Sequence, residues 1–395
     1  MRQHAQDLVY LDYAASTPVD ARVLDCMNDV HCGPAGAANA SSTHAAGRYA
    51  GRIAETAREQ LAALLGAKPS NLIWTSGATE SDNLAIAGAA RFRSHRGRHL
   101  ISMPTEHKAV CDVMEALQRE GFDVTWLTPE PDGRLDLDQL AAAIRPDTQL
   151  VSVMHVNNET GVVQDIEAIG SLCRERDVLY HCDAAQSLGK LPIDLAHLPV
   201  DLMSITGHKV YGPQGIGALY IAERDGCDVY PLLHGGGQER KIRPGTLAVH
   251  LIAGLGKAAE VATGCMRESL AHVTALRDLL WQRICALPGL VRNGSDRFVY
   301  PGILNVSAGD VDGESLMLEL EPLCVASGSA CNSKSREASY VLRALGRSDL
   351  QAQSAVRFSF GRDTPVADVE FAAKRYISAV ERLRSIASPM RSSAR

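Results

Sequence analysis

The chain has 395 residues, of which 46% are hydrophobic and 22% are charged, and its formal net charge is −6. This length is ample for a large core and for two or three domains. The mildly acidic balance contains no block of Lys or Arg, so it gives no support for binding to nucleic acid or to an anionic membrane. No apolar run approaches the roughly 20 residues that span a bilayer, and residues 1–10 lack a signal-peptide core. We therefore expect a soluble, cytoplasmic protein.

Ten cysteines are scattered along the chain without a C-x-x-C pair. Many lie in apolar segments, as Cys182 does. Reduced thiols fit this distribution better than disulfides or a zinc site, so we expect no metal centre.

Strands and helices alternate over residues 9–221. The predicted strands are residues 9–13, 72–75, 99–103, 124–127, 150–156, 178–182, 201–206 and 218–221. The predicted helices are residues 48–65, one from about Asn83, one from His107, residues 136–144 and residues 165–176. This alternation indicates a largely parallel sheet with helices on both faces, in which ligands bind at the carboxyl ends of the strands.

The turn Ser76-Gly-Ala-Thr-Glu-Ser81 separates a strand from a helix. A turn that contains glycine and hydroxyl side chains presents free N–H groups and the positive end of the helix dipole, which suits a phosphate. Ordinary capping of the helix by Thr79 is the alternative interpretation.

Other polar residues follow the strand ends, namely Asn157, Asn158, Asp183, Thr206 and His208. Asp183 comes directly after a buried strand, where a carboxylate is costly unless a positive group meets it. A protonated pyridine nitrogen would be such a partner, and a helix N-cap is the alternative.

Lys209 follows the apolar run 201–206 and begins a turn rich in Gly and Pro. Lysine is rarely placed in such surroundings unless it is paired or used chemically, for example as a Schiff base with pyridoxal phosphate. An exposed turn lysine is the other interpretation. A phosphate turn, an Asp after a strand and a lysine after a later strand together favour the cofactor.

The order of elements changes after residue 246. Residues 246–287 predict a long helix that connects two domains, with a break near Gly254–Gly256 or at Gly264. Beyond it we predict strands at 303–306, 323–326 and 356–360, and helices at 313–320, 337–345 and 366–385. The partial alternation of these strands indicates a half-exposed sheet in a smaller α+β domain. We expect a large domain of residues 14–263 and a small domain of residues 264–395 joined by residues 1–13.

Cys331 stands apart from the other cysteines because small and hydroxyl residues surround it. A thiol in such a loop is expected to be exposed and can act as a nucleophile once deprotonated. An idle surface cysteine is the alternative.

A set of motifs in order along the chain resembles one enzyme family. These are Leu11-Asp-Tyr-Ala-Ala, Ser76-Gly-Ala-Thr-Glu-Ser, Glu106-His107, Asn157-Asn-Glu-Thr-Gly, Asp183-Ala-Ala-Gln, Gly207-His-Lys-Val-Tyr-Gly-Pro, Gly235-Gly-Gly-Gln-Glu-Arg, Arg243-Pro-Gly-Thr, Ser327-Gly-Ser-Ala-Cys and Arg357-Phe-Ser-Phe-Gly. The chain resembles a cysteine desulfurase of the NifS/IscS type, in the class V aminotransferase group. The resemblance implies an α/β fold-type I enzyme that depends on pyridoxal 5′-phosphate, with a mostly parallel seven-stranded sheet and a smaller α+β C-terminal domain.

The resemblance also implies roles for individual residues in cofactor binding. Lys209 would hold the cofactor as a Schiff base and move the substrate α-proton, and His107 would stack on the ring. Asp183 would pair with the pyridinium nitrogen, and Gln186 would hydrogen-bond the ring hydroxyl. The phosphate would be bound by Ala78, Thr79, Thr206 and His208, and by Thr246 from a second subunit of a homodimer.

For the substrate L-cysteine, the resemblance implies that Asn158 and Arg357 hold the carboxylate. Cys331 would attack the sulfur, so that an enzyme persulfide forms and alanine leaves. A sulfur-acceptor protein would then receive the sulfur, for iron–sulfur assembly, nitrogenase maturation, tRNA or cofactor thiolation, or DNA phosphorothioation. A selenocysteine lyase, a class V aminotransferase and a non-catalytic partner protein are the alternative functions.

Overall fold

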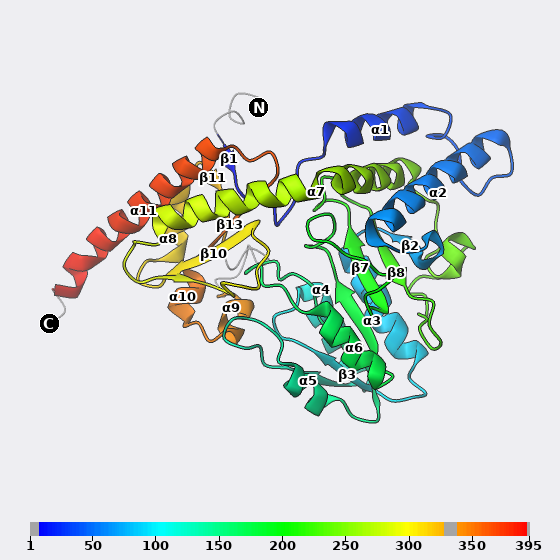
Figure 1. Cartoon of the computed structure of the whole chain (residues 1–395), viewed down its shortest axis with the longest axis horizontal. Coiled ribbons are helices and arrows are strands. Elements are labelled where there is room, and N and C mark those ends of the chain that lie inside the picture. The colour runs from blue at the N-terminus through cyan, green and yellow to red at the C-terminus, as the bar shows by residue number, and fades with distance from the viewer. Residues whose placement is uncertain (1–7, 328–337, 393–395) are drawn as a thin grey trace.

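The computed structural model describes residues 8–327 and 338–392. The described chain is built around a seven-stranded sheet and a four-stranded sheet, and the long helix α7 runs past both of them (Figure 1). The first strand and the last helix of the described chain lie beside the smaller sheet (Figure 1).

The larger sheet consists, in spatial order, of β2 (Leu72–Thr75), β8 (Gly217–Ile221), β7 (Leu202–Thr206), β6 (Leu179–Asp183), β5 (Thr148–Ser152), β3 (His99–Ser102) and β4 (Asp123–Trp126). Strand β8 runs antiparallel to β2 and β7, whereas the other neighbouring pairs are parallel. The predicted mostly parallel seven-stranded sheet is therefore confirmed. All residues of β2, β3, β5, β6, β7 and β8 are buried, because helices cover both faces.

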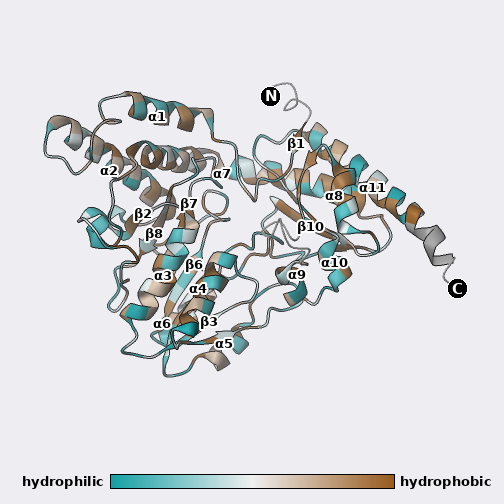
Figure 2. Cartoon of the chain, turned by 180° about the vertical axis from the view of Figure 1, so that it is seen from behind, coloured by the Kyte–Doolittle hydropathy of each residue, from teal (hydrophilic) through white to brown (hydrophobic). Residues whose placement is uncertain are grey.

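Two groups of helices cover the two faces of this sheet. On one face α3 (Ala78–Phe92) and α4 (Lys108–Arg119) form a core with alternate strand residues such as Leu100 and Leu150. On the other face lie α2 (Ala45–Leu65), α6 (Ile166–Glu175) and the first half of α7 (Val249–Ile284). The remaining helical elements of this part are α1 (Ala21–Cys32), α5 (Leu137–Ala143), η1 (Pro69–Asn71) and η2 (Gln238–Lys241). Figure 2 shows the covering helices banded in teal and brown, as expected for amphipathic helices.

Helix α7 is continuous over 36 residues, so the predicted break is wrong. Its glycines permit close packing instead of ending the helix: a Cβ on Gly256 would lie 2.5 Å from the Cα of Ala57 in α2. The residues of α7 up to Ala262 belong to the core of the larger sheet, and those from Val273 belong to the core of the smaller sheet. The predicted domain boundary between residues 263 and 264 falls between these two sets and stays a prediction. Within the described ranges, no helix is both long enough and apolar enough to span a membrane.

The smaller sheet has the spatial order β12 (Ala326–Ser327), β13 (Ala355–Ser359), β10 (Ile303–Ala308) and β9 (Leu290–Arg292), and all its neighbours are antiparallel. Strand β1 (Val9–Tyr10) pairs in parallel with β11 (Leu323–Cys324), which brings the start of the chain to this part of the molecule. The helices here are α8 (Gly313–Leu320), α9 (Tyr340–Ala344), α10 (Asp349–Gln353) and α11 (Val366–Ser392). Strand β9 and helix α10 were not predicted from the sequence.

The sequence pattern predicted a half-exposed smaller sheet, and this prediction is wrong for its two central strands. Every residue of β10 and β13 is buried. Their apolar side chains, such as Val306 and Phe358, pack with the second half of α7 and with α11. Two of their polar side chains bond the larger part of the chain: Asn305 donates to the carbonyl of Glu159 at 3.0 Å and Arg357 to the carbonyl of Asn158 at 2.8 Å. The polar face of the sheet is therefore an internal surface.

Candidate active site

A pocket of roughly 590 Å³ lies where strands of the larger sheet end and the smaller sheet approaches them. Thr206 and Asp183 are the last residues of β7 and β6. The predicted site residues that line this pocket are Ala78, Thr79, His107, Asn158, Asp183, Gln186, Thr206, His208, Lys209 and Arg357. Residues separated by up to 279 positions in the sequence thus meet in one place.

The start of α3 differs from the sequence-based prediction. The helix begins at Ala78 and not near Asn83, and its N-cap is Gly77, to which no side-chain capping bond is made. Capping by Thr79 is therefore wrong. Gly77 has φ +152°, a conformation that favours glycine. The first N–H groups of a helix have no partner within the helix, so the start of α3 offers donors and a positive dipole end to the pocket.

The turn that carries Lys209 is held by the N-terminal segment. The N–H of Thr17 donates to the carbonyl of His208 at 2.8 Å, and the N–H of Tyr211 donates to the Thr17 hydroxyl at 2.8 Å. Tyr211 has φ +62°, and it follows the lysine by two residues. Burial, followed by the charges of Lys209 and Lys190, lowers the pKa of His208 to about 4. His208 is therefore neutral at pH 7.

Asp183 lies in the pocket beside two other buried carboxyl groups. Its Oδ1 accepts the N–H of Ala185 at 2.8 Å, which ties the carboxylate to the chain that follows β6. Burial, with the charge of Asp183 as a further cause, raises the pKa of both Asp82 and Glu106 well above the usual range. The buried surroundings therefore disfavour the ionised forms of Asp82 and Glu106. No role in the site was predicted for Asp82, which directly follows the motif at residues 76–81, or for Glu106, which begins the motif Glu106-His107.

His107 is the N-cap residue of α4, and its Nδ1 accepts the N–H of Ala109 at 3.2 Å. This bond places the ring proton of a neutral imidazole on Nε2. Burial lowers the pKa of His107, although the charge of Asp183 acts in the opposite direction. The ring is thus a neutral, flat group on the pocket wall.

Arg357 reaches the pocket from β13 of the smaller sheet. Its Nη1 donates to the carbonyl of Asn158 at 2.8 Å and its Nη2 to the carboxylate of Asp12 at 2.6 Å. Arg357 Nε and Asn158 Oδ1 are both buried, and neither has a hydrogen-bond partner among the described residues. Two orphaned polar atoms in a pocket wall indicate a polar ligand. The pairing of Asp12 with Arg357 was not predicted from the sequence.

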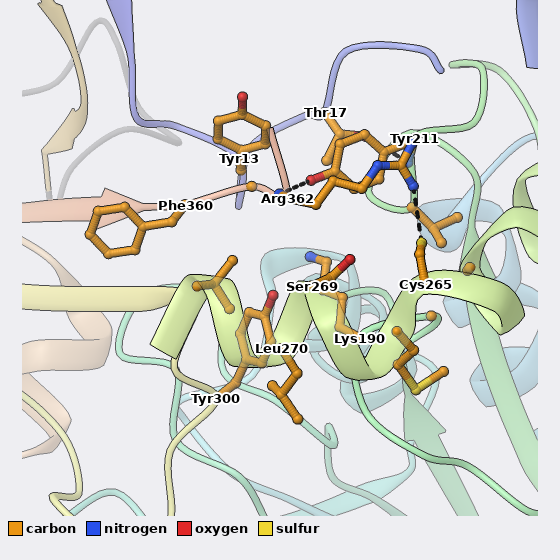
Figure 3. Close-up of a pocket in the computed structure, with 16 residues that line it drawn as sticks. Tyr13, Thr17, Lys190, Tyr211, Cys265, Ser269, Leu270, Tyr300, Phe360 and Arg362 are labelled. Carbon is orange, nitrogen blue, oxygen red and sulfur yellow. Dashed lines mark hydrogen bonds between the residues drawn. The ribbon is translucent and has the colours of Figure 1, made fainter. Parts of the chain in front are cut away.

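Gln186 lines the pocket and bonds Lys190, which lines a second, smaller cavity. Its Nε2 donates to the carbonyl of Ala14 at 2.7 Å, and its Oε1 accepts from Nζ of Lys190 at 3.1 Å. Figure 3 shows Lys190 in this cavity near α7, and its Nζ lies 5.6 Å from the ring centroid of Tyr300. Burial, followed by the charges of Lys209 and Arg357, lowers the pKa of Lys190 to about 7. Lys190 was not predicted as a site residue, and its sequence signal is its position four residues after Gln186.

The aminotransferase class-V family matches residues 9–371. This chain belongs to the class-V aminotransferase family. The cysteine desulfurase IscS of Mannheimia succiniciproducens is 51% identical to it over 383 residues, which cover 97% of this chain and 95% of that protein. Among solved structures, a NifS-like protein is 35% identical with a TM-score of 0.88, over 95% of this chain and 99% of that one. SspA, solved in complex with cysteine, is 39% identical with a TM-score of 0.80, over 89% of this chain and 98% of that one.

Enzymes of this class-V group depend on pyridoxal phosphate, and the pocket fits that cofactor. The fit has three parts: the uncapped start of α3 for the phosphate, the carboxylate of Asp183 for a protonated ring nitrogen, and the amine of Lys209 for the aldehyde. The family match and the neighbouring structures confirm the predicted family and fold.

Two predicted site residues are not part of the described pocket. Thr246 is exposed and does not line it, and its role in a second subunit stays a prediction. Cys331 lies outside the described residues.

Proposed function

We propose that this class-V enzyme is a cysteine desulfurase that depends on pyridoxal phosphate and converts L-cysteine to L-alanine. The C–S bond of the substrate breaks and an S–S bond forms with the thiol of Cys331. The substrate Cβ gains the electron pair of the broken bond and a proton, while the enzyme thiol is oxidised to a persulfide. The reaction is therefore balanced without an external oxidant, and the persulfide sulfur passes to an acceptor protein.

This proposal rests on one pocket that contains both the groups suited to the cofactor and a separate binding position for a carboxylate. Lys209, Asp183 and the start of α3 line one part of it. The orphaned Nε–H of Arg357 is a donor that suits an amino-acid carboxylate, and the orphaned Oδ1 of Asn158 is an acceptor that suits a donor group of the same ligand. The 51% identity to an IscS cysteine desulfurase over 97% of the chain supports cysteine as that amino acid.

The residues would hold the cofactor by charge and hydrogen bonds. The N–H groups of Ala78 and Thr79, with the side chains of Thr206 and His208, bind the phosphate. Asp183 keeps the ring nitrogen protonated. When bound, the cofactor withdraws electrons from the Cα of an attached amino acid.

Other groups orient the ring and move protons. Gln186 donates to the ring hydroxyl through the second N–H of its Nε2, because the first N–H bonds the carbonyl of Ala14 and Oε1 accepts from Lys190. His107 lies against the ring as a neutral imidazole. Nζ of Lys209 accepts the α-proton of the substrate and returns a proton to the product.

The experiment measures alanine and sulfide released from L-cysteine, with a thiol reductant present to discharge the persulfide. The native protein should bind pyridoxal phosphate and release both products in equal amounts, whereas Cys331→Ala should release neither. Cys285→Ala is the matched control, because Cys285 is an exposed free cysteine that does not line the pocket, and it should retain full activity. Full desulfuration by Cys331→Ala would exclude the sulfur relay and favour transamination or lyase chemistry.

We also propose a cytoplasmic homodimer in which Thr246 completes the phosphate site of the other subunit. Its exposed position supports this role. Sedimentation should give twice the 42.4 kDa mass of one chain, and Thr246→Ala should weaken cofactor binding without changing that mass. A monomer with full cofactor occupancy would contradict the dimer.

A further inference from the structure

The short segment that contains η2 has an unusual backbone. Glu239, Arg240 and Lys241 have φ values of 44°, 58° and 66°, so three consecutive residues with side chains occupy the left-handed region. Each such residue is strained, and strain of this kind persists only where the surroundings fix it. Two arginine–glutamate pairs fix this segment.

The first pair joins Glu239 to Arg58 of α2. Nη1 and Nη2 of Arg58 donate to the two carboxylate oxygens of Glu239 at 3.0 and 2.8 Å, and both side chains are at most 9% exposed. The same carboxylate accepts the N–H of Trp74 at 2.7 Å. Trp74 lies in β2, the edge strand that leads to the start of α3. Glu239 therefore fixes the strand before the anion-binding turn.

The second pair joins Arg243 to Glu80 in the first turn of α3. Nε and Nη2 of Arg243 donate to Oε1 and Oε2 of Glu80 at 2.8 and 3.3 Å. Glu80 Oε2 also accepts the N–H of Ser76 at 2.7 Å. Burial raises the pKa of Glu80, but the bonds from Arg243 and Ser76 outweigh it and the net shift is downward. Glu80 is therefore an ionised carboxylate.

These two pairs hold the turn before α3 at both of its ends. Glu239 takes the N–H of Trp74 and Glu80 takes the N–H of Ser76, while the N–H groups of Ala78 and Thr79 remain available to the pocket. Glu80 lines the same pocket, so its negative charge would repel an anion bound at the start of α3. The guanidinium of Arg243 cancels that charge.

We propose that Arg243 and Glu239 are positioning residues that make the turn at residues 76–79 an anion site, Arg243 by neutralising Glu80 and Glu239 by fixing β2. The inference rests on the proposed function, because the anion is the phosphate of the cofactor. Arg243 acts within its own subunit through Glu80 and does not touch the cofactor. This role is separate from that of Thr246 in the same segment.

The experiment compares the affinity of the cofactor-free protein for pyridoxal 5′-phosphate and for pyridoxal, measured by absorbance. The dissociation constant for pyridoxal divided by that for pyridoxal 5′-phosphate isolates the contribution of the phosphate. Arg243→Met should lower this ratio about tenfold or more, because a charged group beside the anion is left unneutralised. Glu80→Gln combined with Arg243→Met should recover part of the ratio, since the repelling charge is then absent. Glu239→Gln should lower it by a smaller factor.

Arg91→Met is the matched control. Arg91 lies at the far end of the same helix and pairs with Glu120 at 2.7 Å, so its loss should leave the ratio unchanged. An Arg243→Met ratio within twofold of the native value would overturn the inference while leaving the proposed function intact. Native protein that binds both compounds equally would overturn both. If Arg243→Met does not fold, Arg243→Lys, which keeps the charge and loses the fork, should give a near-native ratio, and a large loss in that variant would contradict charge neutralisation.

Discussion

Replacement of Arg357 by lysine should impair recognition of the substrate carboxylate while leaving the fold intact. The guanidinium donates one N–H to the carbonyl of Asn158 and one to Asp12, and its Nε has no partner among the described residues. A lysine ammonium keeps the positive charge but lacks the planar fork, so at least one charge-assisted hydrogen bond to the carboxylate is lost. Such a bond contributes about 1.5–3 kcal/mol, which corresponds to a roughly 10- to 150-fold loss.

The assay measures kcat and KM for L-cysteine, together with spectroscopic binding of L-cysteine and of cysteamine, which lacks the carboxylate. Arg357→Lys should weaken L-cysteine binding by the factor above and leave cysteamine binding nearly unchanged. Arg382→Lys is the control, because Arg382 forms an exposed ion pair with Glu319 at 3.3 Å. A variant whose kcat/KM for L-cysteine stays within threefold of the native value, or that loses cysteamine binding to the same degree, would refute the assignment.

Three further predictions concern stability, each measured as the shift in urea midpoint relative to the native protein. Burial raises the pKa of Glu159 to about 7, so the free energy of unfolding of the native protein should fall as pH rises from about 4.5 to 7. Glu159→Gln lacks this titration, so its stability relative to the native protein should increase by up to about 3 kcal/mol between pH 5 and 8. Burial lowers the pKa of Lys190 to about 7, so above pH 7 the unfolded protein binds more protons than the native protein, and the free energy of unfolding rises with pH. Lys190→Met removes this dependence, so its gain in stability over the native protein should shrink by about 2 kcal/mol from pH 7 to 9. A gain that stays constant over this range would contradict the prediction. Gly256→Ala should cost about 1–3 kcal/mol, because the added Cβ would meet Ala57 at 2.5 Å, whereas Gly264→Ala in the same helix meets nothing within 4 Å and should be neutral or stabilising.

The larger sheet and most of its site could be predicted because their signals are local. Apolar runs such as residues 202–206 favour buried strands, and a polar residue at the end of such a strand lies at the ligand-binding edge of the sheet. Thr206 and Asp183 were therefore identifiable as candidates from their positions alone. The resemblance to a known family then supplied the individual roles.

The features that were missed depend on contacts between distant parts of the chain. The glycines of α7 predicted a break because the sequence does not show that α2 packs against Gly256. The polar residues of β10 and β13 indicated a solvent-facing side, but that side meets residues 158 and 159 of the larger part. In the same way, the partner of Arg58 is Glu239, which lies 181 positions away, and no local pattern connects them.

The unbroken course of α7 has a consequence for how substrate is recognised. One end of this helix is embedded in the core that supports Lys209, and the other end in the core beneath β13, which carries Arg357. Because one continuous helix packs into both cores, the separation between the Lys209 amine and the Arg357 guanidinium is set before any amino acid binds. The entropy cost of bringing the two groups together is then met during folding. Little of the free energy of cysteine binding is needed to order the binding site.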